Sequence, residues 1–580
     1  MVVFSAQKIG VPIFITLNFK GGIFLRMTGA EMVVKTLEKN GVKVVFGYPG
    51  AANCPIIDKL SFSSIKHILT RNEQGAAHMA SGYARVTKQA GVCTATSGPG
   101  ATNLITGIAT AYMDSIPMVA LTGQVATKLI GKDAFQEVDI TGATLPFTKH
   151  SYLIKDGLDI PRVVNEAFHI ANTGRPGPVL IDFPMDLLKK EFDYPEEDED
   201  VNIRGYKLMG KANESQVKKV AEAIKGAKKP VILAGGGVVI SDATNEFRKF
   251  VKETDIPVVS TMMGIGILPS DNPRYYGMIG SHGVKRANLL FNRADLVIVM
   301  GSRLGDRTVA NVKGLEEGNK LIHIDLDPAE IGKNTQPYIP VVGDIKDVLE
   351  QLTSQISGYK TNKEWIDEAE ELRQRFTHKP VCEDNGFVNP KYFLNVLSEK
   401  TNSDVYLSTE VGQNQIWCAN NFKTPRSLLT SGGFGTMGYG LPAAIGASVA
   451  ANGSKPVIAV MGDGSFQMDL PEMGTMAQWD IPVKMVLFQN HRLGMVHEHQ
   501  YLLYKSNYQA VEIEGKPDFA MLAKAYGFES GIANENSEVS EAIDKMMAHD
   551  GSYLLIVNVN PFEPTGDALN EATLPKKEDK

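Results

Sequence analysis

The apolar run Val457-Ile458-Ala459-Val460-Met461 leads directly into Gly462-Asp463-Gly464. Residues 465–488 separate this turn from Gln489-Asn490, which follows a second apolar run at Val483–Phe488. Short runs rich in β-branched residues predict strands. In open sheets of the α/β class, ligands bind beyond the carboxyl ends of the strands. The loops that begin at Gly462 and Gln489 are therefore where binding chemistry is expected.

These two loops resemble the diphosphate- and metal-binding motif of thiamine-diphosphate enzymes. Asp463 offers an anionic oxygen and Asn490 a neutral amide oxygen, and both suit Mg²⁺. The resemblance adds the backbone carbonyl of Arg492 as a third protein ligand. It also places three small residues against the diphosphate, namely Gly462, Gly464 and Ser465. Gly-Asp-Gly alone is a common turn, so the preceding strand, the spacing and Asn490 carry the assignment.

The same alternation of short β-branched runs and amphipathic helical patterns occurs in three stretches of the chain. This alternation is typical of parallel sheets covered by helices. A length of 580 residues agrees with about three domains. We therefore predict an α/β fold of three doubly wound parallel-sheet domains, at 27–190, 205–352 and 385–562. The resemblance makes them a pyrimidine-binding, a central FAD-binding-like and a diphosphate-binding domain, between an N-terminal extension (1–26) and a C-terminal tail (563–580).

Two polar segments are predicted to separate the domains. One is the acidic run Tyr194–Asp200, and the other is the region Thr361–Asn389, which contains a helix-like charged run at Glu364–Arg375. Thr28-Gly29-Ala30-Glu31 predicts a capping box at the first helix of the first domain. Further strands are predicted at Lys43–Phe46, Val92–Thr96, Pro117–Leu121 and Val179–Asp182.

The composition is that of a globular protein, with 43% hydrophobic and 22% charged residues. The formal charge of −7 is spread along the chain, which argues against nucleic acid or an anionic membrane as a partner. Cys54, Cys93, Cys382 and Cys418 form no close pair, so we interpret them as reduced structural thiols of a cytoplasmic protein. The apolar stretch Gly10–Thr16 is too short to span a bilayer, and it lacks a clear export cleavage site.

Glu73 matches the activating carboxylate of the thiamine-diphosphate family. It lies in Arg71-Asn72-Glu73-Gln74-Gly75, just after the run Ile68-Leu69-Thr70. These enzymes need a carboxyl group at the pyrimidine N1′, so that the 4′-amino group can accept the thiazolium C2 proton. An isolated Glu73 would instead be interpreted as a helix-start carboxylate or a partner of Arg71. The family usually has His where Asn72 stands, a departure that leaves the carboxylate in place.

Other loops of the first domain resemble further family motifs. Phe46–Ala52 is similar to the active-site loop beside the cofactor and contains Gly50, while Thr96–Asn103 and Ala111–Pro117 are similar to shared pyrimidine-domain motifs. Phe135-Gln136 is the feature most diagnostic of acetolactate synthases. By this resemblance Gln136 hydrogen-bonds the carbonyl or oxyanion of the reacting acid and Phe135 lines the pocket. A buried glutamine that satisfies backbone groups is the alternative.

Two segments of the last domain resemble cofactor contacts. The first is Val411-Gly412-Gln413-Asn414, similar to the first diphosphate contact, with Asn414 where the family usually has His. Both side chains can donate a hydrogen bond to phosphate. The second is Gly433–Pro442, similar to the segment that holds the aminopyrimidine, with Gly435 in its backbone and Met437 as the apolar wedge that keeps the cofactor bent.

The middle domain carries a glycine-rich turn after the run Val231–Ala234. Such a turn alone is weak evidence for a dinucleotide. The resemblance assigns FAD contacts, with Arg for the pyrophosphate and acidic residues for the ribose or adenine edges. These positions are Arg175, Gly236, Gly237, His282, Gly301, Ser302, Arg303, Asp325 and Asp344. Leu304-Gly305 and Ser281 depart from the usual residues, and acetolactate formation has no net redox step, so FAD would be largely structural.

The resemblance covers the chain from Met27 to about Pro561, with its motifs in the family's order. It implies the catalytic large subunit of an acetolactate synthase, in branched-chain amino-acid biosynthesis. Such an enzyme decarboxylates pyruvate and joins the two-carbon fragment to a second 2-keto acid, using thiamine diphosphate, Mg²⁺ and FAD. It would be a homodimer or homotetramer, and a regulatory small subunit is a further candidate partner.

Three alternatives remain. A pyruvate oxidase or related decarboxylase is disfavoured by Phe135-Gln136, and a nicotinamide dehydrogenase leaves Glu73 and the metal motif without a role. A non-catalytic paralogue would be expected to have lost Glu73 or Asp463, and both are present. One departure concerns specificity, because His499 stands where the family usually has a Trp that favours 2-ketobutyrate as acceptor. We therefore expect chiefly 2-acetolactate as product.

Overall fold

The computed structural model describes residues 15–17, 23–195, 201–209, 211–309, 320–377, 384, 386–423, 428–513, 515 and 517–566. Cys382 and most of the predicted acidic linker lie outside the described residues. The chain forms two compact units. Unit 1 comprises Met1–Lys207, Gly433–Ser454 and Asp469–Pro482, and unit 2 comprises Leu208–Gly432, Lys455–Met468 and Val483–Lys580.

Unit 1 is built on a parallel sheet of order β4-β3-β5-β6-β8-β7. The strands are β3 (Val44–Gly47), β4 (Lys66–Leu69), β5 (Gly91–Ala95), β6 (Met118–Gln124), β7 (His150–Leu153) and β8 (Pro178–Pro184). Its α-helices are α1 (Gly29–Lys39), α2 (Cys54–Leu60), α3 (Glu73–Thr87), α4 (Pro99–Asn103), α5 (Ile105–Met113), α6 (Ile140–Thr144), α7 (Ile160–Asn172), α8 (Met185–Lys189), α18 (Gly440–Ala451) and α20 (Met473–Trp479).

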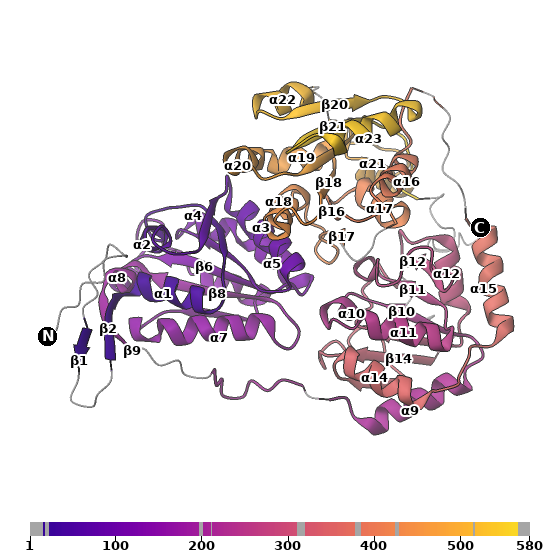
Figure 1. The fold of residues 1–580 in the computed structure, drawn as a ribbon, viewed down its shortest axis with the longest axis horizontal. Helices are drawn as coiled ribbons and strands as arrows, with labels where there is room; N and C mark the ends of the chain where they lie inside the picture. Colours follow the sequence, from indigo (N-terminus) through magenta and orange to yellow (C-terminus); the bar gives the residue numbers. More distant parts are fainter. Residues whose placement is uncertain are drawn as a thin grey trace. The chain divides into compact units, whose positions relative to one another are not determined.

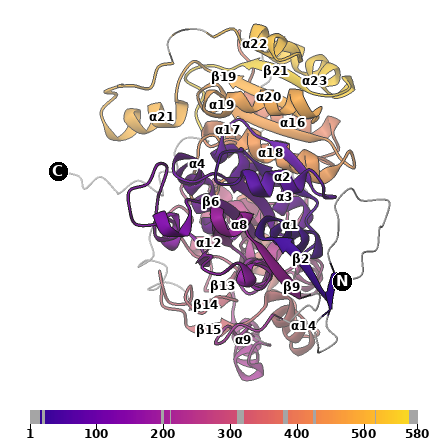
Figure 2. The ribbon, with the colours of Figure 1, turned by 90° about the vertical axis from the view of Figure 1, so that its left-hand side faces the viewer.

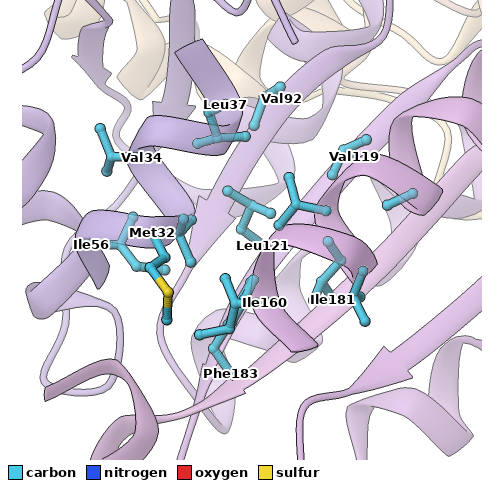
Figure 3. Packing of buried hydrophobic residues seen from close by; sticks show 14 of the residues in the cluster. Met32, Val34, Leu37, Ile56, Val92, Val119, Leu121, Ile160, Ile181 and Phe183 are labelled. Atoms are coloured by element: carbon cyan, nitrogen blue, oxygen red, sulfur yellow. The ribbon is translucent and has the colours of Figure 1, made fainter. Parts of the chain in front are cut away.

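Helices cover both faces of this sheet. One face packs its alternate residues Val119, Leu121 and Ile181 against Leu37 of α1 and Ile160 of α7, as Figure 3 shows. Helix α3 lies against β3, β5 and β6. The predicted capping box is confirmed, because Thr28 Oγ1 accepts the Glu31 N–H and Glu31 accepts the Thr28 N–H.

The N-terminal limit of the first domain differs from the prediction. A small antiparallel sheet joins β1 (Ile15–Leu17), β2 (Ile23–Thr28) and β9 (Glu191–Pro195), and Figure 2 shows β2 beside β9. Tyr194, which was predicted to begin a solvated linker, is only 2% exposed in the core of unit 1. The ordered domain therefore begins before Met27 and continues past residue 190.

Unit 2 contains two parallel sheets (Figure 1). The first has the order β12-β11-β10-β13-β14-β15 and comprises β10 (Pro230–Ala234), β11 (Val258–Ser260), β12 (Tyr275–Met278), β13 (Leu296–Met300), β14 (Lys320–Asp325) and β15 (Ile339–Val342). Its α-helices are α9 (Glu214–Gly226), α10 (Gly237–Ile240), α11 (Thr244–Thr254), α12 (Lys285–Arg293), α14 (Ile345–Gln355) and α15 (Lys363–Arg375).

Alternation along β10 shows that this sheet is doubly wound. Ile232 packs in one core with α9, α11 and α14, whereas Val231 and Leu233 pack in a second core with α12 and α15. The predicted helical run at Glu364–Arg375 is confirmed as α15, but Trp365 is buried in that second core. The helix therefore extends the middle domain beyond the predicted limit of 352.

The other sheet of unit 2 has the order β17-β16-β18-β19-β21-β20. Its strands are β16 (Tyr406–Thr409), β17 (Leu428–Leu429), β18 (Val457–Gly462), β19 (Lys484–Gln489), β20 (Glu529–Ala533) and β21 (Tyr553–Asn558). The α-helices are α16 (Pro390–Lys400), α17 (Gln413–Asn421), α19 (Asp463–Asp469), α21 (Gly494–Leu503), α22 (Phe519–Ala525) and α23 (Val539–Ala548). The predicted fold class of three parallel-sheet domains is confirmed.

The strand orders locate three candidate sites. When its strands are numbered along the chain, the sheet with β3 and the sheet with β16 both read 2-1-3-4-6-5. The order therefore reverses between β3 and β5 in one sheet and between β16 and β18 in the other. The middle sheet reads 3-2-1-4-5-6, the dinucleotide-binding order, with its reversal between β10 and β13. Ligands bind at such switch points, beyond the carboxyl ends of the strands.

Candidate active site

The loops after β3 and β5 pack tightly at the switch point of unit 1. A Cβ atom on Gly50 would lie 2.5 Å from Thr96 Cβ, so only glycine permits this approach. The Ala52 N–H donates to Thr96 Oγ1 (3.2 Å), and the Gly50 N–H donates to Asn53 Oδ1 (2.7 Å). These contacts hold the backbone at Gly50 in a fixed position beside the sheet edge.

Glu73 is the first residue of α3 and lies at the same edge. Its Oε2 accepts a hydrogen bond from Asn103 Nδ2 (2.9 Å), and its Oε1 lies 3.1 Å from where a Cβ on Gly100 would be. Asn72 caps the helix by accepting the Gln74 N–H (2.7 Å). Arg71 donates instead to Gly474 O and Gln478 Oε1. The half-buried carboxylate of Glu73 therefore lies beside the predicted loop at Thr96–Asn103.

Gln136 lies against the same loop in a strained conformation. Its φ is +58°, a left-handed value that is rare for residues other than Gly, Asn and Asp and that recurs at functional sites. A Cβ on Gly98 would lie 2.8 Å from Gln136 O, so the two backbones touch. Glu137 fixes this loop by accepting the N–H groups of Gly131 and Ala134, and these bonds lower the pKa of its carboxyl group. Phe135 is 88% exposed, so within this chain it does not line a closed pocket.

Asp463 follows β18 at the switch point of the last sheet. The carboxylate is 2% exposed; its Oδ2 accepts the His491 N–H (2.7 Å), and its Oδ1 has no hydrogen-bond partner among the described residues. Burial raises the pKa of Asp463 to about 6, while the His491 N–H opposes this rise. A buried carboxylate oxygen without a partner is costly, and a divalent cation is a ligand that would satisfy it. The residues therefore fit a metal.

The loop after β19 meets the start of α17 at Asn490 and Gln413. Asn490 Nδ2 donates to Gln413 Oε1 (3.3 Å), and Asn490 Oδ1 accepts the Arg492 N–H (3.1 Å). Gln413 Nε2 in turn donates to Glu563 O (2.9 Å). Three helices, α17, α19 and α21, begin within or just after these loops, and helix N-termini favour anions. A diphosphate with its cation suits this arrangement.

Asn414 occupies the position where the family usually has His. Its Nδ2 donates to Glu410 O (2.8 Å) and Val460 O (3.2 Å), so its donors are engaged by the backbone. Its Oδ1 lies near Gly412, whose φ of +145° favours glycine. In this structure Asn414 therefore orders the loop, and the predicted hydrogen bond from its side chain to phosphate would need the amide to reorient.

The predicted aminopyrimidine segment is held within unit 1. Gly435, at φ +73°, lies between two anchored residues, Gly433 and Thr436, and Met437 directly follows the second. The Gly433 N–H donates to Asp114 Oδ1 (2.7 Å), and the Thr436 and Thr110 hydroxyl groups lie 2.7 Å apart. Asp114 also pairs with Arg85 (2.7 Å), with both side chains nearly buried. The sequence marks Ala111–Pro117 only as similar to a shared pyrimidine-domain motif, so this anchoring by Asp114 was missed.

The candidate FAD residues of unit 2 follow neighbouring strands of the middle sheet. Gly235 and Gly237 after β10 pack against Gly301 after β13, where a Cβ on Gly237 would lie 2.6 Å from Gly301 Cα, while Gly236 lies against Met263. His323 Nε2 donates to Ser302 O (2.9 Å), and Leu304 is buried at φ +52°. These close backbone contacts occur at the switch point of a dinucleotide-type sheet.

The remaining candidate FAD residues have structural partners in this chain. Asp325 Oδ1 accepts the Asp327 N–H, and Asp344 caps α14 by accepting the Lys346 N–H. His282 O accepts Asn420 Nδ2, and burial lowers the pKa of the His282 ring. Arg175, in unit 1, donates to Ser115 Oγ (2.9 Å). Each of these residues has a local hydrogen-bonding role in this chain. Their contacts with FAD stay predictions.

None of the helices in the described part of the chain is both long and apolar enough to cross a bilayer.

Comparison with known proteins identifies the family. Three family models match: "Thiamine pyrophosphate enzyme, N-terminal TPP binding domain" at residues 27–143, the central domain at 217–352, and the C-terminal TPP binding domain at 410–557. A probable acetolactate synthase large subunit of Methanocaldococcus jannaschii is 45% identical, with 95% of each chain covered.

Two bacterial relatives carry the same name. The acetolactate synthase large subunit of Corynebacterium glutamicum is 43% identical over 90% of this chain and 84% of its own. That of Haemophilus influenzae is 39% identical over 96% of this chain and 99% of its own. The chain therefore belongs to the acetolactate synthase large-subunit family of thiamine pyrophosphate enzymes.

Proposed function

We propose that this protein makes 2-acetolactate from two molecules of pyruvate, as the catalytic subunit of an acetolactate synthase in branched-chain amino-acid biosynthesis. The observation that carries the proposal is the placement of two carboxylates in sheets with the same strand order. Asp463 follows β18 at the switch point of one sheet, and Glu73 opens α3 beside the loop after β5, at the switch point of the other. One carboxylate suits the pyrimidine of thiamine diphosphate and the other suits the metal on its diphosphate. Thiamine diphosphate carries a pyrimidine at one end and a diphosphate at the other. The presence of one candidate carboxylate for each end supports binding of this cofactor.

The residues have separate tasks in this proposal. Thiamine diphosphate, when bound, supplies the nucleophilic carbon and accepts the electron pair released when carbon dioxide leaves. Glu73 holds and returns a proton at the pyrimidine N1′. Asp463, Asn490 and the Arg492 carbonyl hold Mg²⁺, and Gln136 donates a hydrogen bond to the oxygen of the reacting keto acid.

We further propose that FAD binds at the switch point between β10 and β13. The dinucleotide-type strand order and the glycine contacts between Gly237 and Gly301 support this assignment. Because the proposed reaction involves no net oxidation, the flavin would serve the structure rather than the chemistry. The absorbance spectrum of the purified protein tests this directly, since a chain that binds no flavin when FAD is supplied contradicts the assignment.

The decisive experiment measures acetolactate formation from pyruvate with thiamine diphosphate and Mg²⁺, with and without FAD. We expect product in both conditions once the metal and thiamine diphosphate are present. Reduction of the flavin by pyruvate, without acetolactate, would favour a pyruvate oxidase instead. Absence of both products in a folded, cofactor-loaded protein would refute the proposal.

The acceptor preference is proposed from His499. This residue is exposed on α21, with its ring 6.1 Å from that of Tyr504. It therefore offers little apolar surface against which the ethyl group of 2-ketobutyrate could pack. One methylene is worth about 1–3 kcal/mol in a well-formed pocket. In a competition between pyruvate and 2-ketobutyrate we expect little selectivity. Preference for 2-ketobutyrate above about tenfold, or roughly 1.4 kcal/mol, would show that another residue provides the wall.

We also propose that the active enzyme is a homodimer or larger, with Glu73 and Asp463 of a working site supplied by different copies of the chain. The relatives in Methanocaldococcus jannaschii and Corynebacterium glutamicum are named large subunits, so a small regulatory subunit is a further proposed partner. A cytoplasmic location is proposed from the unpaired Cys54, Cys93 and Cys418.

A further inference from the structure

Glu472 is a buried carboxylate that no sequence motif marks. It ends the 3₁₀ turn Leu470–Glu472, just before α20, and its side chain is 0% exposed. Its Oε1 accepts the N–H groups of Arg71 and Asn72, each at 3.0 Å, while Oε2 accepts Thr475 Oγ1 (2.6 Å). Arg71 and Asn72 are the two residues immediately before Glu73. The carboxylate therefore holds the backbone that leads into the proposed proton-carrying residue.

Three further contacts bind the same stretch to α20. The Arg71 guanidinium donates to Gly474 O (3.0 Å) and Gln478 Oε1 (2.8 Å). Thr475 Oγ1 also lies 3.3 Å from Leu69 O, at the end of β4. From Leu69 to Asn72 the chain is thus held by α20 and the turn before it. The position of Glu73 depends on this support as well as on α3.

Gly75 provides the space that Glu472 needs. A Cβ at Gly75 would lie 2.3 Å from Glu472 Oε1, closer than non-bonded atoms approach. Burial raises the pKa of Glu472, while bonds from Thr475, Arg71 and Asn72 oppose that rise. The start of a helix also favours negative charge. Three donors and a helix start therefore surround the Glu472 carboxylate beside the start of α3.

We propose that Glu472 is a positioning residue for Glu73: by holding the Arg71 and Asn72 N–H groups, it fixes where the Glu73 carboxylate meets the pyrimidine of thiamine diphosphate. The inference rests on the proposed function, because it takes Glu73 to be the proton carrier. A displacement of about 1 Å at a reacting group can cost about 100-fold in rate. Loss of Glu472 should therefore slow cofactor activation without removing any group that touches the cofactor.

Three substitutions separate this role from general stability. Glu472→Ala removes both acceptor oxygens, and Glu472→Gln keeps one. Gly75→Ala leaves the carboxylate but pushes it away, and it favours the helix by about 1 kcal/mol. The matched control is Glu166→Gln, because Glu166 is a buried carboxylate of unit 1 that accepts bonds from Tyr152 and Arg162 instead.

The first measurement uses the cofactor-free protein. Hydrogen exchange, read on peptides that cover residues 70–77, reports whether the Arg71 and Asn72 amides are held. We expect exchange of these amides to accelerate by about tenfold or more in Glu472→Ala, by less in Glu472→Gln, and not at all in Glu166→Gln. Unchanged protection in Glu472→Ala would overturn the proposal at its structural step.

The second measurement follows deuterium exchange at C2 of bound thiamine diphosphate by quenching and NMR. We expect a fall of about 100-fold in Glu472→Ala and a clear fall in Gly75→Ala, partial recovery in Glu472→Gln, and thiamine-diphosphate affinity within about threefold throughout. Wild-type C2 exchange in Glu472→Ala and Gly75→Ala, with rapid amide exchange, would overturn the proposal. Wild-type C2 exchange in Glu73→Gln would instead overturn the role of Glu73, and with it the proposed function.

Discussion

Helix α3 carries a fully buried histidine whose protonation is expected to oppose folding. His78 is 0% exposed, and neither ring nitrogen has a hydrogen-bond partner among the described residues. Its ring meets the Tyr439 ring edge to face, with centroids 5.2 Å apart. Burial lowers the pKa of His78 from 6.5 to about 3. The folded protein therefore keeps this ring neutral at any pH where enzymes usually work.

The sign and size of the effect follow from linkage. Between pH 6.5 and about pH 3 the unfolded chain binds a proton at His78 and the folded chain does not, so stability falls as the pH falls. The loss amounts to about 2 kcal/mol at pH 5 and is close to zero at pH 7.5. Asp182 acts in the opposite direction, because burial raises its pKa to about 7, and its extra proton stabilises the folded state as the pH falls below that value.

A comparison of variants isolates the histidine from Asp182. Between pH 7.5 and pH 5, the free energy of unfolding should fall by about 2 kcal/mol less in His78→Leu than in the wild type. The free energy of opening of α3 can be read by native-state hydrogen exchange, corrected for intrinsic rates, with substitution of the exposed His150 as the control. If the free energy of opening changes with pH in the same way in His78→Leu and in the wild type, His78 takes up the proton in the folded state. The reasoning from burial would then fail.

The remaining predictions concern the proposed active site. Glu73→Gln should lower turnover by about 100-fold or more, the usual contribution of acid–base catalysis, with cofactor affinity nearly unchanged; near-normal turnover in steady-state assays would contradict its role. Asp463→Asn should abolish metal-dependent retention of thiamine diphosphate in titrations. It should leave the cofactor-free chain no less stable in urea, because the Oδ1 atom has no partner among the described residues to lose. Retained metal-dependent affinity would remove Asp463 from the metal site. Mixing these two inactive variants under subunit exchange should restore part of the activity, and a fully active monomer in sedimentation would exclude the proposed shared site.

Much of the fold was predictable because its sheets are parallel and buried. The β-branched runs at Val457–Met461 and Val179–Asp182 fall within strands β18 and β8, as predicted. Polar composition was a poorer guide to the domain limits. Tyr194 and Trp365 lie in stretches dominated by charge, yet each buries one large ring in a core. A single aromatic residue can attach a polar segment to a domain, and no periodic pattern reveals it.

A motif can predict a site residue that would contact a ligand through its own chemistry. Glu73 and Asp463 were predicted in this way, and their roles stay predictions; in the structure Asp463 follows β18, and Glu73 lies beside the loop after β5. Asp114 and Glu472 were missed because they act on backbone N–H groups of segments distant in the chain, Gly433 and Arg71–Asn72. A side chain that accepts backbone N–H groups from a distant segment has no fixed spacing from that segment, so no sequence motif marks it. Only the fold brings donor and acceptor together.

The sheets that carry Glu73 and Asp463 have the same strand order. The two carboxylates differ in the groups that surround them. In each sheet the predicted site carboxylate lies near the reversal of strand order, where loops diverge and leave room for a ligand. In unit 1 the Glu73 carboxylate opens α3 and accepts a hydrogen bond from the neutral amide of Asn103. In unit 2 Asp463 is buried, its Oδ1 has no partner among the described residues, and a cation would satisfy that oxygen. Under the proposed function, the same strand order would therefore serve proton transfer in unit 1 and metal binding in unit 2, because the groups around each carboxylate differ.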